Sequence, residues 1–254
     1  MILIDKLSYR SKLRYVNASE KLMYAVLTLI LCILSHSVRV AALVFVINGI
    51  LTVGKGGIPL SRYVKLLMIP LAFLILGTAA IVVNVSKVPL DAFAFRLGEW
   101  YITGSMAGIY RALELCATAL SAVTCLYFLS LNTVMTDILD ALRKLHFPSL
   151  LIELMLLIYR FIFVLFQTAS AITVSQQARL GNRDFKTRIR SFGAMGSELF
   201  ILALKRSNVL YDAMESRCYD GNIRVLTRMQ PPRAGEIAAI AAIELILVLV
   251  WICG

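Results

Sequence analysis

The chain has 254 residues, of which 59% are hydrophobic and only 16% are charged, and its mean hydropathy is +0.81. Soluble domains are less apolar and more charged than this, so the composition excludes a water-soluble fold. The formal net charge of +11 would suggest nucleic-acid binding in a soluble protein. In a membrane protein it indicates topology instead, because Lys and Arg gather in cytoplasmic loops.

The amino-terminal half contains four apolar runs that are expected to cross the membrane as helices. Lipid cannot satisfy an open strand edge, and about 30 Å of hydrocarbon needs roughly 20 helical residues. Residues 22–53, broken at residues 35–39, give two short spans, residues 66–85 give a third, and a fourth ends at Leu131. The amino-terminal segment is rich in Lys and Arg and is therefore assigned to the cytoplasm. The loop after the third span is expected outside.

A short helix that lies along a membrane surface is predicted over residues 133–145. Apolar residues share one helical face, and charged residues occupy the other. Pro148 then stands where a new helix would begin, since the first turn tolerates a residue without an N–H. The charged residues of the short helix are Asp137, Asp140, Arg143 and Lys144.

Two long helices are predicted next, over residues 149–174 and 191–217. The first is apolar enough to span a membrane, yet basic residues flank both of its ends, so it is expected to stay on the cytoplasmic side. Both helices carry polar residues at intervals of seven, which places these residues in one stripe. They could form ion pairs between the two helices or face solvent, and the sequence leaves both open. The stripe consists of Glu153, Arg160, Glu198, Lys205 and Asp212.

The second long helix also has a stretch of small residues. Gly193, Ala194, Gly196 and Ala203 leave part of it without bulk. Small residues let another helix approach closely. We therefore expect the two long helices to cross.

A last span over residues 236–252 completes five crossings and places the carboxyl terminus outside. Glu244 lies within this span, either as a functional group or as a bundle-facing residue that hydrogen-bonds a neighbour. The predicted fold is an all-α polytopic membrane protein with about five transmembrane helices plus one short and two long cytoplasmic helices. The expected parts are a membrane domain with four spans at residues 1–131, a cytoplasmic helical region at residues 132–234 and the last transmembrane helix at residues 235–254.

Catalytic and metal sites are not expected in this chain. The two histidines, His36 and His146, are predicted on opposite sides of the membrane, and the five cysteines lie far apart without a Cys-x-x-Cys motif. The sequence contains no phosphate-binding loop, and Asp137 and Asp140 lie beside basic residues rather than beside a nucleophile. Any nucleotide hydrolysis must come from a partner.

Each long helix ends in a short motif centred on an arginine. Residues 177–181 read Gln-Ala-Arg-Leu-Gly, and residues 213–221 read Ala-Met-Glu-Ser-Arg-Cys-Tyr-Asp-Gly, with the two arginines 38 residues apart. This pair resembles the doubled Ala-Arg-Gly signature of the T component of energy-coupling factor (ECF) transporters. The opening stretch 5–11 and the run 151–163 resemble the cobalt-type, CbiQ-like branch. In both motifs another residue replaces the third-position glycine, so the packing of each helix end departs from the family pattern.

The resemblance implies a subunit that joins a small substrate-binding integral membrane protein to two cytoplasmic ABC-type ATPases in a bacterial or archaeal cell membrane. Those ATPases would bind ATP and Mg, and this chain would carry no cofactor. It implies Co²⁺ as the transported ion, and no residue of this chain distinguishes Co²⁺ from Ni²⁺. By motif match, the implied ATPase-coupling residues are Ala178, Arg179, Gly181, Ser216, Arg217 and Gly221.

The chemistry of arginine suits such docking. A guanidinium keeps its charge, binds carboxylates through two parallel hydrogen bonds and is stabilised at a helix carboxyl end. Without the resemblance, both arginines would be interpreted as solvated or headgroup-binding ends of basic helices. The other functions weighed are a secondary transporter, a lipid-modifying enzyme and a T component for another micronutrient.

Overall fold

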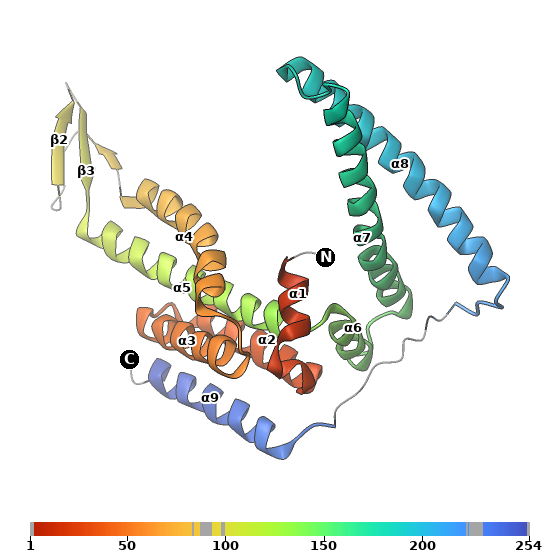
Figure 1. The fold of residues 1–254 in the computed structure, drawn as a ribbon. Helices are drawn as coiled ribbons and strands as arrows, with labels where there is room; N and C mark the ends of the chain where they lie inside the picture. Colours follow the sequence, from red (N-terminus) through yellow and green to blue (C-terminus); the bar gives the residue numbers. More distant parts are fainter. Residues whose placement is uncertain are drawn as a thin grey trace. The chain divides into compact units, whose positions relative to one another are not determined.

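A computed structural model describes residues 3–82, 84–86, 93–97, 100–221, 223 and 231–252. The chain divides into two compact units (Figure 1): a membrane unit of residues 2–138 and 228–254, and a hairpin unit of residues 139–227. The membrane unit contains α1 (Leu3–Arg10), the 3-10 helix η1 (Lys12–Tyr15), α2 (Ala18–Ser35), α3 (Val38–Ile50), the π-helix η2 (Leu51–Lys55), α4 (Leu60–Val82), β1 (Asn84–Ser86), β2 (Phe93–Leu97), β3 (Trp100–Gly104), α5 (Met106–Asn132) and α9 (Ala234–Ile252). The hairpin unit contains most of α6 (Met135–Lys144), together with α7 (Ser149–Ala178) and α8 (Phe185–Glu215).

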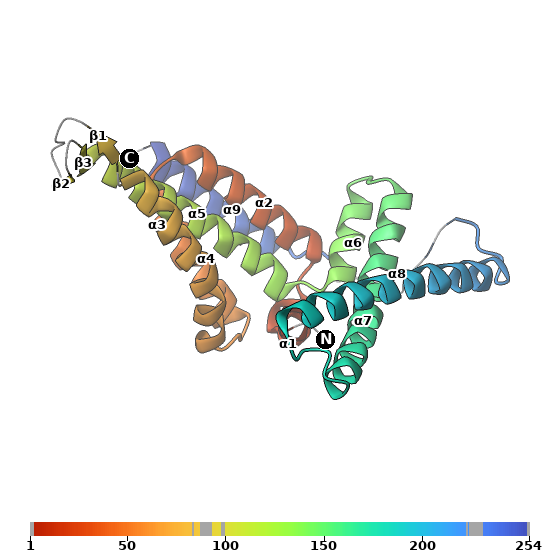
Figure 2. The same cartoon turned by 90° about the horizontal axis from the view of Figure 1, so that it is seen from above.

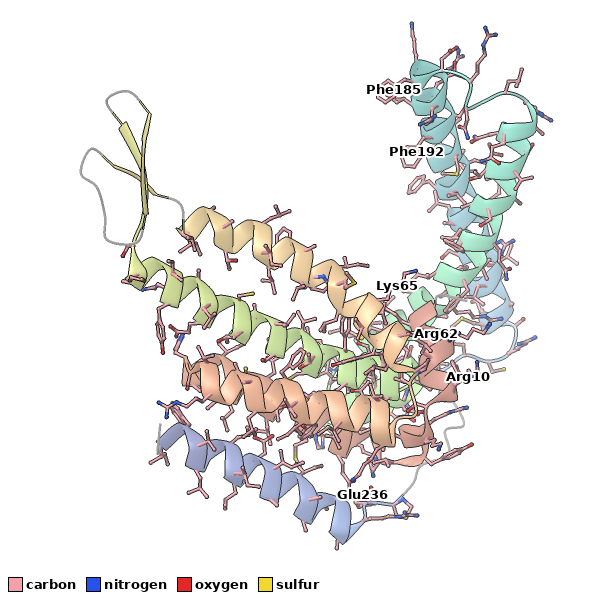
Figure 3. All side chains as sticks on the ribbon, turned by 60° about the vertical axis from the view of Figure 1, so that its left-hand side comes forward. Arg10, Arg62, Lys65, Phe185, Phe192 and Glu236 are labelled. Carbon is pink, nitrogen blue, oxygen red and sulfur yellow. The ribbon has the colours of Figure 1, made fainter. Side chains whose placement is uncertain are left out.

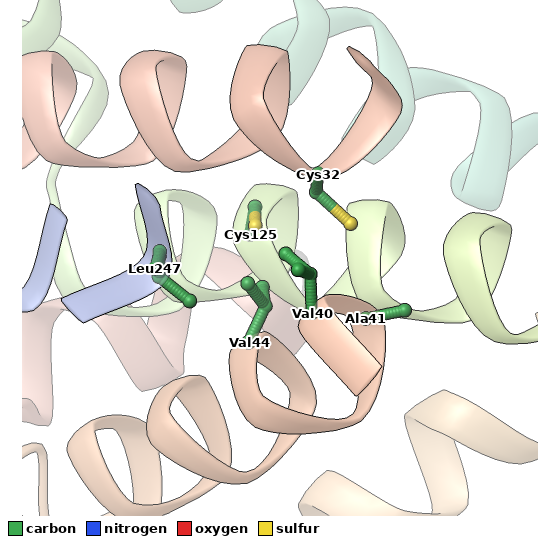
Figure 4. Close-up of a cluster of buried hydrophobic side chains, with 6 residues drawn as sticks. All are labelled: Cys32, Val40, Ala41, Val44, Cys125 and Leu247. Atoms are coloured by element: carbon green, nitrogen blue, oxygen red, sulfur yellow. The ribbon is translucent and has the colours of Figure 1, made fainter. Parts of the chain in front are cut away.

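The core of the membrane unit lies where α2, α3, α5 and α9 pack side by side (Figure 2). Figure 4 shows its central cluster of small and medium side chains. Such side chains let helix backbones approach closely, which is how helices associate where lipid removes the hydrophobic driving force. The cluster consists of Cys32, Val40, Ala41, Val44, Cys125 and Leu247.

Hydrogen bonds between buried polar side chains also join these helices. Asn48 of α3 is fully buried, accepts from the Tyr24 hydroxyl at 3.0 Å and donates to the Cys125 sulfur at 3.1 Å. Ser121 of α5 donates to the carbonyl of Ala41 at 2.6 Å. Because the surrounding side chains are apolar, each such pair satisfies groups that would otherwise remain unpaired in the bundle.

Contacts within the membrane unit show which helix termini share each of its ends. At one end, the Lys21 ammonium near the start of α2 donates to the carbonyl of Asn132 at the end of α5 at 2.9 Å. A groove beside Lys21 is also lined by Glu236 at the start of α9. At the other end, His36 after α2 lies 3.8 Å from Glu114 near the start of α5, measured from Nδ1 to Oε1. Thus α2 and α9 run in one direction and α5 runs in the other, as the predicted order of spans requires.

Among the described residues, six helices are long and apolar enough to cross a membrane, namely α2, α3 with η2, α4, α5, α7 and α9. The predicted polytopic membrane protein is therefore confirmed. The sequence analysis excluded α7 from the spans because of its basic flanks and not because of its hydropathy. The cytoplasmic position of α7 stays a prediction, since length and composition alone do not place it.

A small antiparallel sheet stands between α4 and α5, in the region that the sequence analysis treated as a loop. Its strand order is β1-β3-β2, with Val85 and Phe95 both paired with Ile102. Aromatic and β-branched residues favour this conformation. The other elements that the structure describes are helical, so the predicted all-α class is confirmed with this sheet as an addition.

The hairpin unit brings α7 and α8 together near the turn that joins them. The Gln176 side-chain amide donates to the carbonyl of Ser191 at 2.9 Å, and Thr173 contacts Met195 through a bond of 3.5 Å between Oγ1 and Sδ. Gly193 and Gly196 do not lie at this contact, because an added Cβ would meet no atom within 4 Å at either residue. The crossing of the two long helices stays a prediction. These glycines face open space on α8.

Candidate functional site: two arginine-bearing helix ends

The first arginine motif forms a regular cap at the end of α7. The Leu180 N–H donates to the carbonyl of Gln177 at 3.1 Å, and the Gly181 N–H donates to the carbonyl of Gln176 at 2.7 Å. Leu180 lies in the left-handed region, with φ of +58°. This pair of bonds with one left-handed residue is the Schellman motif, which satisfies carbonyls that the helix end leaves unpaired. Arg179 is the residue directly before the left-handed one.

The second motif repeats this geometry at the end of α8. The Cys218 N–H donates to the carbonyl of Glu215 at 3.0 Å, and the Tyr219 N–H donates to the carbonyl of Met214 at 3.1 Å. Cys218 is left-handed, with φ of +57°. Arg217 therefore stands in the second cap where Arg179 stands in the first. The two motifs are the same local structure and not merely similar in sequence.

The caps explain where these motifs depart from the ECF signature. The third-position glycine of that signature corresponds to Leu180 and Cys218, the two left-handed residues. Glycine adopts this conformation without strain, whereas a side chain costs roughly 1–2 kcal/mol there. The departure therefore affects backbone strain at each cap, and both caps still form.

The first cap is fixed to the start of α8. The Ser191 hydroxyl donates to the carbonyl of Gly181 at 2.9 Å, in addition to the bond between Gln176 and Ser191. A Cβ at position 181 would lie 2.8 Å from the Gln176 carbonyl oxygen and 2.9 Å from the Ser191 hydroxyl oxygen. Only glycine fits, so Gly181 is a structural requirement of this cap, whereas Gly221 has open space around it.

The second cap is fixed to α6 and α7 instead. Glu153 of α7 accepts the Tyr219 hydroxyl at 2.5 Å and the Ile223 N–H at 3.0 Å. Arg143 of α6 donates to the carbonyl of Ile223 at 3.2 Å. The hydrogen bond to Glu153 is the main cause of a raised pKa of the Tyr219 phenol, because the bond favours the protonated hydroxyl.

Both arginines are exposed, and they stand at opposite ends of α8. Arg179 precedes its first residue and Arg217 follows its last. With 31 residues at 1.5 Å each, α8 separates the two motifs by about 45 Å. The neighbouring motif residues Ala178, Ser216 and Gly221 are also exposed, so each motif is open to a partner.

The polar stripe forms none of the ion pairs between α7 and α8 that the sequence left open. Arg160 of α7 and Lys205 of α8 line the same groove between the helices, and two basic groups there repel each other. Glu153 is used in the second cap, while Glu198 and Asp212 are exposed. No ion pair of a stripe residue is found in the described part of the chain, so for the exposed stripe residues the solvated face fits better.

One face of α8 exposes large apolar side chains that no other described residue covers. Figure 3 shows Phe185 and Phe192 projecting from α8, and these residues are 77% and 70% exposed. The open positions Gly193 and Gly196 lie on the same stretch of the helix. Large exposed apolar side chains that lie close together mark a contact with a membrane or with another protein. Ile189, Phe200 and Leu204 extend the face.

The remaining predicted candidates do not combine into a site. Both carboxylate oxygens of Glu244 are buried and lack a hydrogen-bond partner in the described part of the chain, so the neighbour expected for this residue is not found. In the described residues, no three His, Cys, Asp or Glu side chains are grouped to hold a metal ion.

Comparison with known proteins gives matches along almost the whole chain. The family model of the cobalt transport protein CbiQ matches residues 10–229. The chain is 32% identical to an uncharacterized protein of Methanocaldococcus jannaschii, over 97% of this chain and 91% of that protein. It is 27% identical to the cobalt transport protein CbiQ of Salmonella typhimurium, over 87% and 99%. It is 29% identical to the energy-coupling factor transporter transmembrane protein EcfT of Staphylococcus aureus, over 86% and 83%.

Proposed function

Since this chain belongs to the CbiQ family of cobalt transport proteins, we propose that it couples ATP hydrolysis to metal import in an ECF-type transporter. Members of the family are transport components and not enzymes. The proposed complex contains two cytoplasmic ABC-type ATPases, which bind ATP and Mg, and a small substrate-binding integral membrane subunit. The proposed cargo is Co²⁺, with Ni²⁺ as the alternative.

The observation that carries this proposal is the repeated cap. Two exposed arginines stand in the same backbone geometry about 45 Å apart, at the two ends of one rigid helix. We call each cap with its arginine an arm. Two copies of one ATPase present the same groove twice, so each copy can bind one of the two equivalent arms. A coupling element must change its state in response to both of the sites that it connects, and a continuous helix between the two arms can do so.

The proposal places the hairpin unit on the cytoplasmic side, with the amino terminus also inside and the carboxyl terminus outside. Basic residues support this orientation, because they flank α7 at both ends and are dense before α2. In this position α7 is an apolar helix that lies against the membrane or another subunit, although it is long enough to cross. Both arginine arms then reach the same compartment.

The exposed apolar face of α8 is proposed to contact the substrate-binding subunit. Phe185, Phe192 and the open glycines offer ridges and gaps into which a helix of that subunit can pack. Recognition of the ion is assigned to that subunit. Closure of the ATPases would move the arms, and α8 would carry the movement to this face.

A secondary transporter is the alternative function, and Glu244 favours it. An ionisable group within a membrane span, without a hydrogen-bond partner in the described chain, is the kind of group that ion-coupled carriers use. Such a carrier would need no ATPase.

Purification in mild detergent, followed by liposome uptake, distinguishes the two functions. The proposed function predicts that two ATPase copies and a small membrane protein co-purify with this chain. Cobalt should then accumulate in liposomes only when the whole complex and ATP are present. Cobalt uptake by this chain alone without ATP, or purification without any ATPase, would contradict the proposal.

A further inference from the structure

We propose that Glu153 is a positioning residue that clamps the Arg217 arm to the base of α7, so that the two docking arms are held by different chemistry. The inference rests on the proposed docking role of Arg217 and adds what determines the position of that arm. Neither the sequence motifs nor the family match assigns a role to Glu153.

Glu153 joins parts of the hairpin unit that are distant in sequence. Its two carboxylate oxygens accept from Tyr219 and from the Ile223 N–H, which are 66 and 70 residues away. Arg143, which is 80 residues away in sequence, donates to the carbonyl of the same residue, Ile223. The backbone of Ile223 is therefore held at both its N–H and its carbonyl, six residues after Arg217.

The burial of Glu153 shows that these bonds are needed. The residue is only 5% exposed, and a buried carboxylate without hydrogen-bond donors would be strongly unfavourable. Both oxygens have a donor, so the folded arm is what satisfies this carboxylate. If the arm moves away, Glu153 loses both partners, and this cost resists displacement of Arg217.

The two arms consequently differ in which part of the hairpin unit a displacement of their arginine would affect. The Arg179 cap is held by neutral bonds among Gln176, Gly181 and Ser191, all close to the hairpin turn. The Arg217 cap is held by a carboxylate and a guanidinium from α7 and α6. A pull on Arg179 therefore acts on the turn, whereas a pull on Arg217 also acts on the base of α7 and on α6.

The clamp has a characteristic dependence on pH. The groups that raise the pKa of the Tyr219 phenol are Glu153 first, with smaller effects from Asp220 and Tyr211. Because the folded pKa is raised, the bond is fully present below the ordinary tyrosine pKa of about 10 and is lost as pH rises through the folded value. Above it, a tyrosinate would face the carboxylate of Glu153, and the arm should loosen.

The mobility of the Arg217 arm can be measured by electron paramagnetic resonance with a nitroxide label on Cys218, which is exposed and lies within the arm. The full-length protein is used with its other cysteines replaced. Glu153→Gln and Tyr219→Phe should each increase label mobility, and Tyr219→Phe should also remove the rise in mobility at high pH.

The matched control Glu198→Gln changes an exposed stripe residue and should have no effect. A label at Leu180→Cys should not respond to Glu153→Gln. Unchanged mobility at Cys218 in both clamp variants would overturn the clamp.

Binding of the purified ATPase then tests whether the clamp positions the docking arm. In an Arg179→Glu background only the second arm binds, and Glu153→Gln should weaken that binding about tenfold, as expected for losing a charge-assisted hydrogen bond. Unchanged affinity would overturn the positioning role if Arg217→Glu abolishes binding in the same background. If Arg217→Glu has no effect either, the proposed docking function fails instead.

Discussion

The double substitution Arg179→Glu with Arg217→Glu is expected to abolish metal import while leaving the protein inserted in the membrane. Both side chains are exposed and stand just beyond the helices, so the substitutions should not affect packing within the chain. At an interface, however, replacing one member of a buried charge pair costs roughly 2–5 kcal/mol. That is about 30-fold to several thousandfold in affinity for each arm.

Each single substitution should weaken ATPase association, and the double variant should lose it, as measured by co-purification and by ATP-dependent cobalt accumulation in cells. Arg188→Glu is a matched control, because it removes an exposed arginine of α8 that belongs to neither motif. Membrane content of the variant chain is measured in the same cells. Normal import by the double variant would show that the arginines are not the docking groups.

Opposite changes in stability are expected from two substitutions at adjacent positions of the first cap. Gly181→Ala places a Cβ 2.8 Å from a backbone carbonyl oxygen that cannot swing aside, and we expect it to destabilise the hairpin by roughly 1–3 kcal/mol. Leu180→Gly relieves the left-handed strain at a side chain that is 68% exposed. It should stabilise the cap by up to about 1 kcal/mol, less the entropy that glycine adds to the unfolded chain.

Thermal denaturation in detergent measures these stabilities, and ATPase binding through the Arg179 arm measures the consequence for docking. Gly181→Ala should weaken that arm about tenfold or more, because the cap that orients Arg179 is displaced. Gly221→Ala is the control at the corresponding end of the second motif, where the Cβ meets no atom within 4 Å. Gly221 itself has φ of +84°, so alanine should cost roughly 1–2 kcal/mol of backbone strain there, but it should leave ATPase binding through the Arg179 arm unchanged. Equal tolerance of alanine at positions 181 and 221 would contradict the packing argument for the first cap.

The membrane helices could be predicted because apolar runs of sufficient length have few other folds available. The helix break near His36 and the helix start after Pro148 could both be predicted from the residues there. In the structure α2 ends at the first position and α7 begins at the second. The boundary of α8 was predicted less well. It begins at Phe185, six residues before the predicted start. The start was missed because every second residue of 185–190 is basic, which hides the helical period.

The sheet between α4 and α5 had a sequence signature that was outweighed by the membrane spans around it. Aromatic and β-branched residues in residues 93–103 favour strands, but a stretch so short gives a weak pattern. The helix caps are a different case. The positions of Arg179 and Arg217 at the helix ends were predicted, whereas the left-handed conformation of Leu180 and Cys218 was not, because those residue types rarely adopt it.

The functions of the polar residues on the long helices could not be predicted from their seven-residue spacing. A seven-residue interval places Glu153 and Arg160 on one stripe, but their partners depend on how the chain returns after α8. Glu153 meets Tyr219, a contact between residues 66 apart in sequence. Small residues at positions 193 and 196 likewise predict that a helix can approach, without showing whether that helix belongs to this chain.

The side of the membrane that each arginine faces tests the central claim most directly. Arg179→Cys and Arg217→Cys, each made in a chain without other reactive cysteines, can be labelled with a membrane-impermeant maleimide in intact cells and in inverted vesicles. The coupling function predicts that both positions react only from the cytoplasmic face, because α7 does not cross. Labelling of both positions from the outer face would show that α7 spans the membrane. Labelling of the two positions from opposite faces would show that α8, which lies between them, crosses instead, so that the two arginines could not reach one ATPase pair.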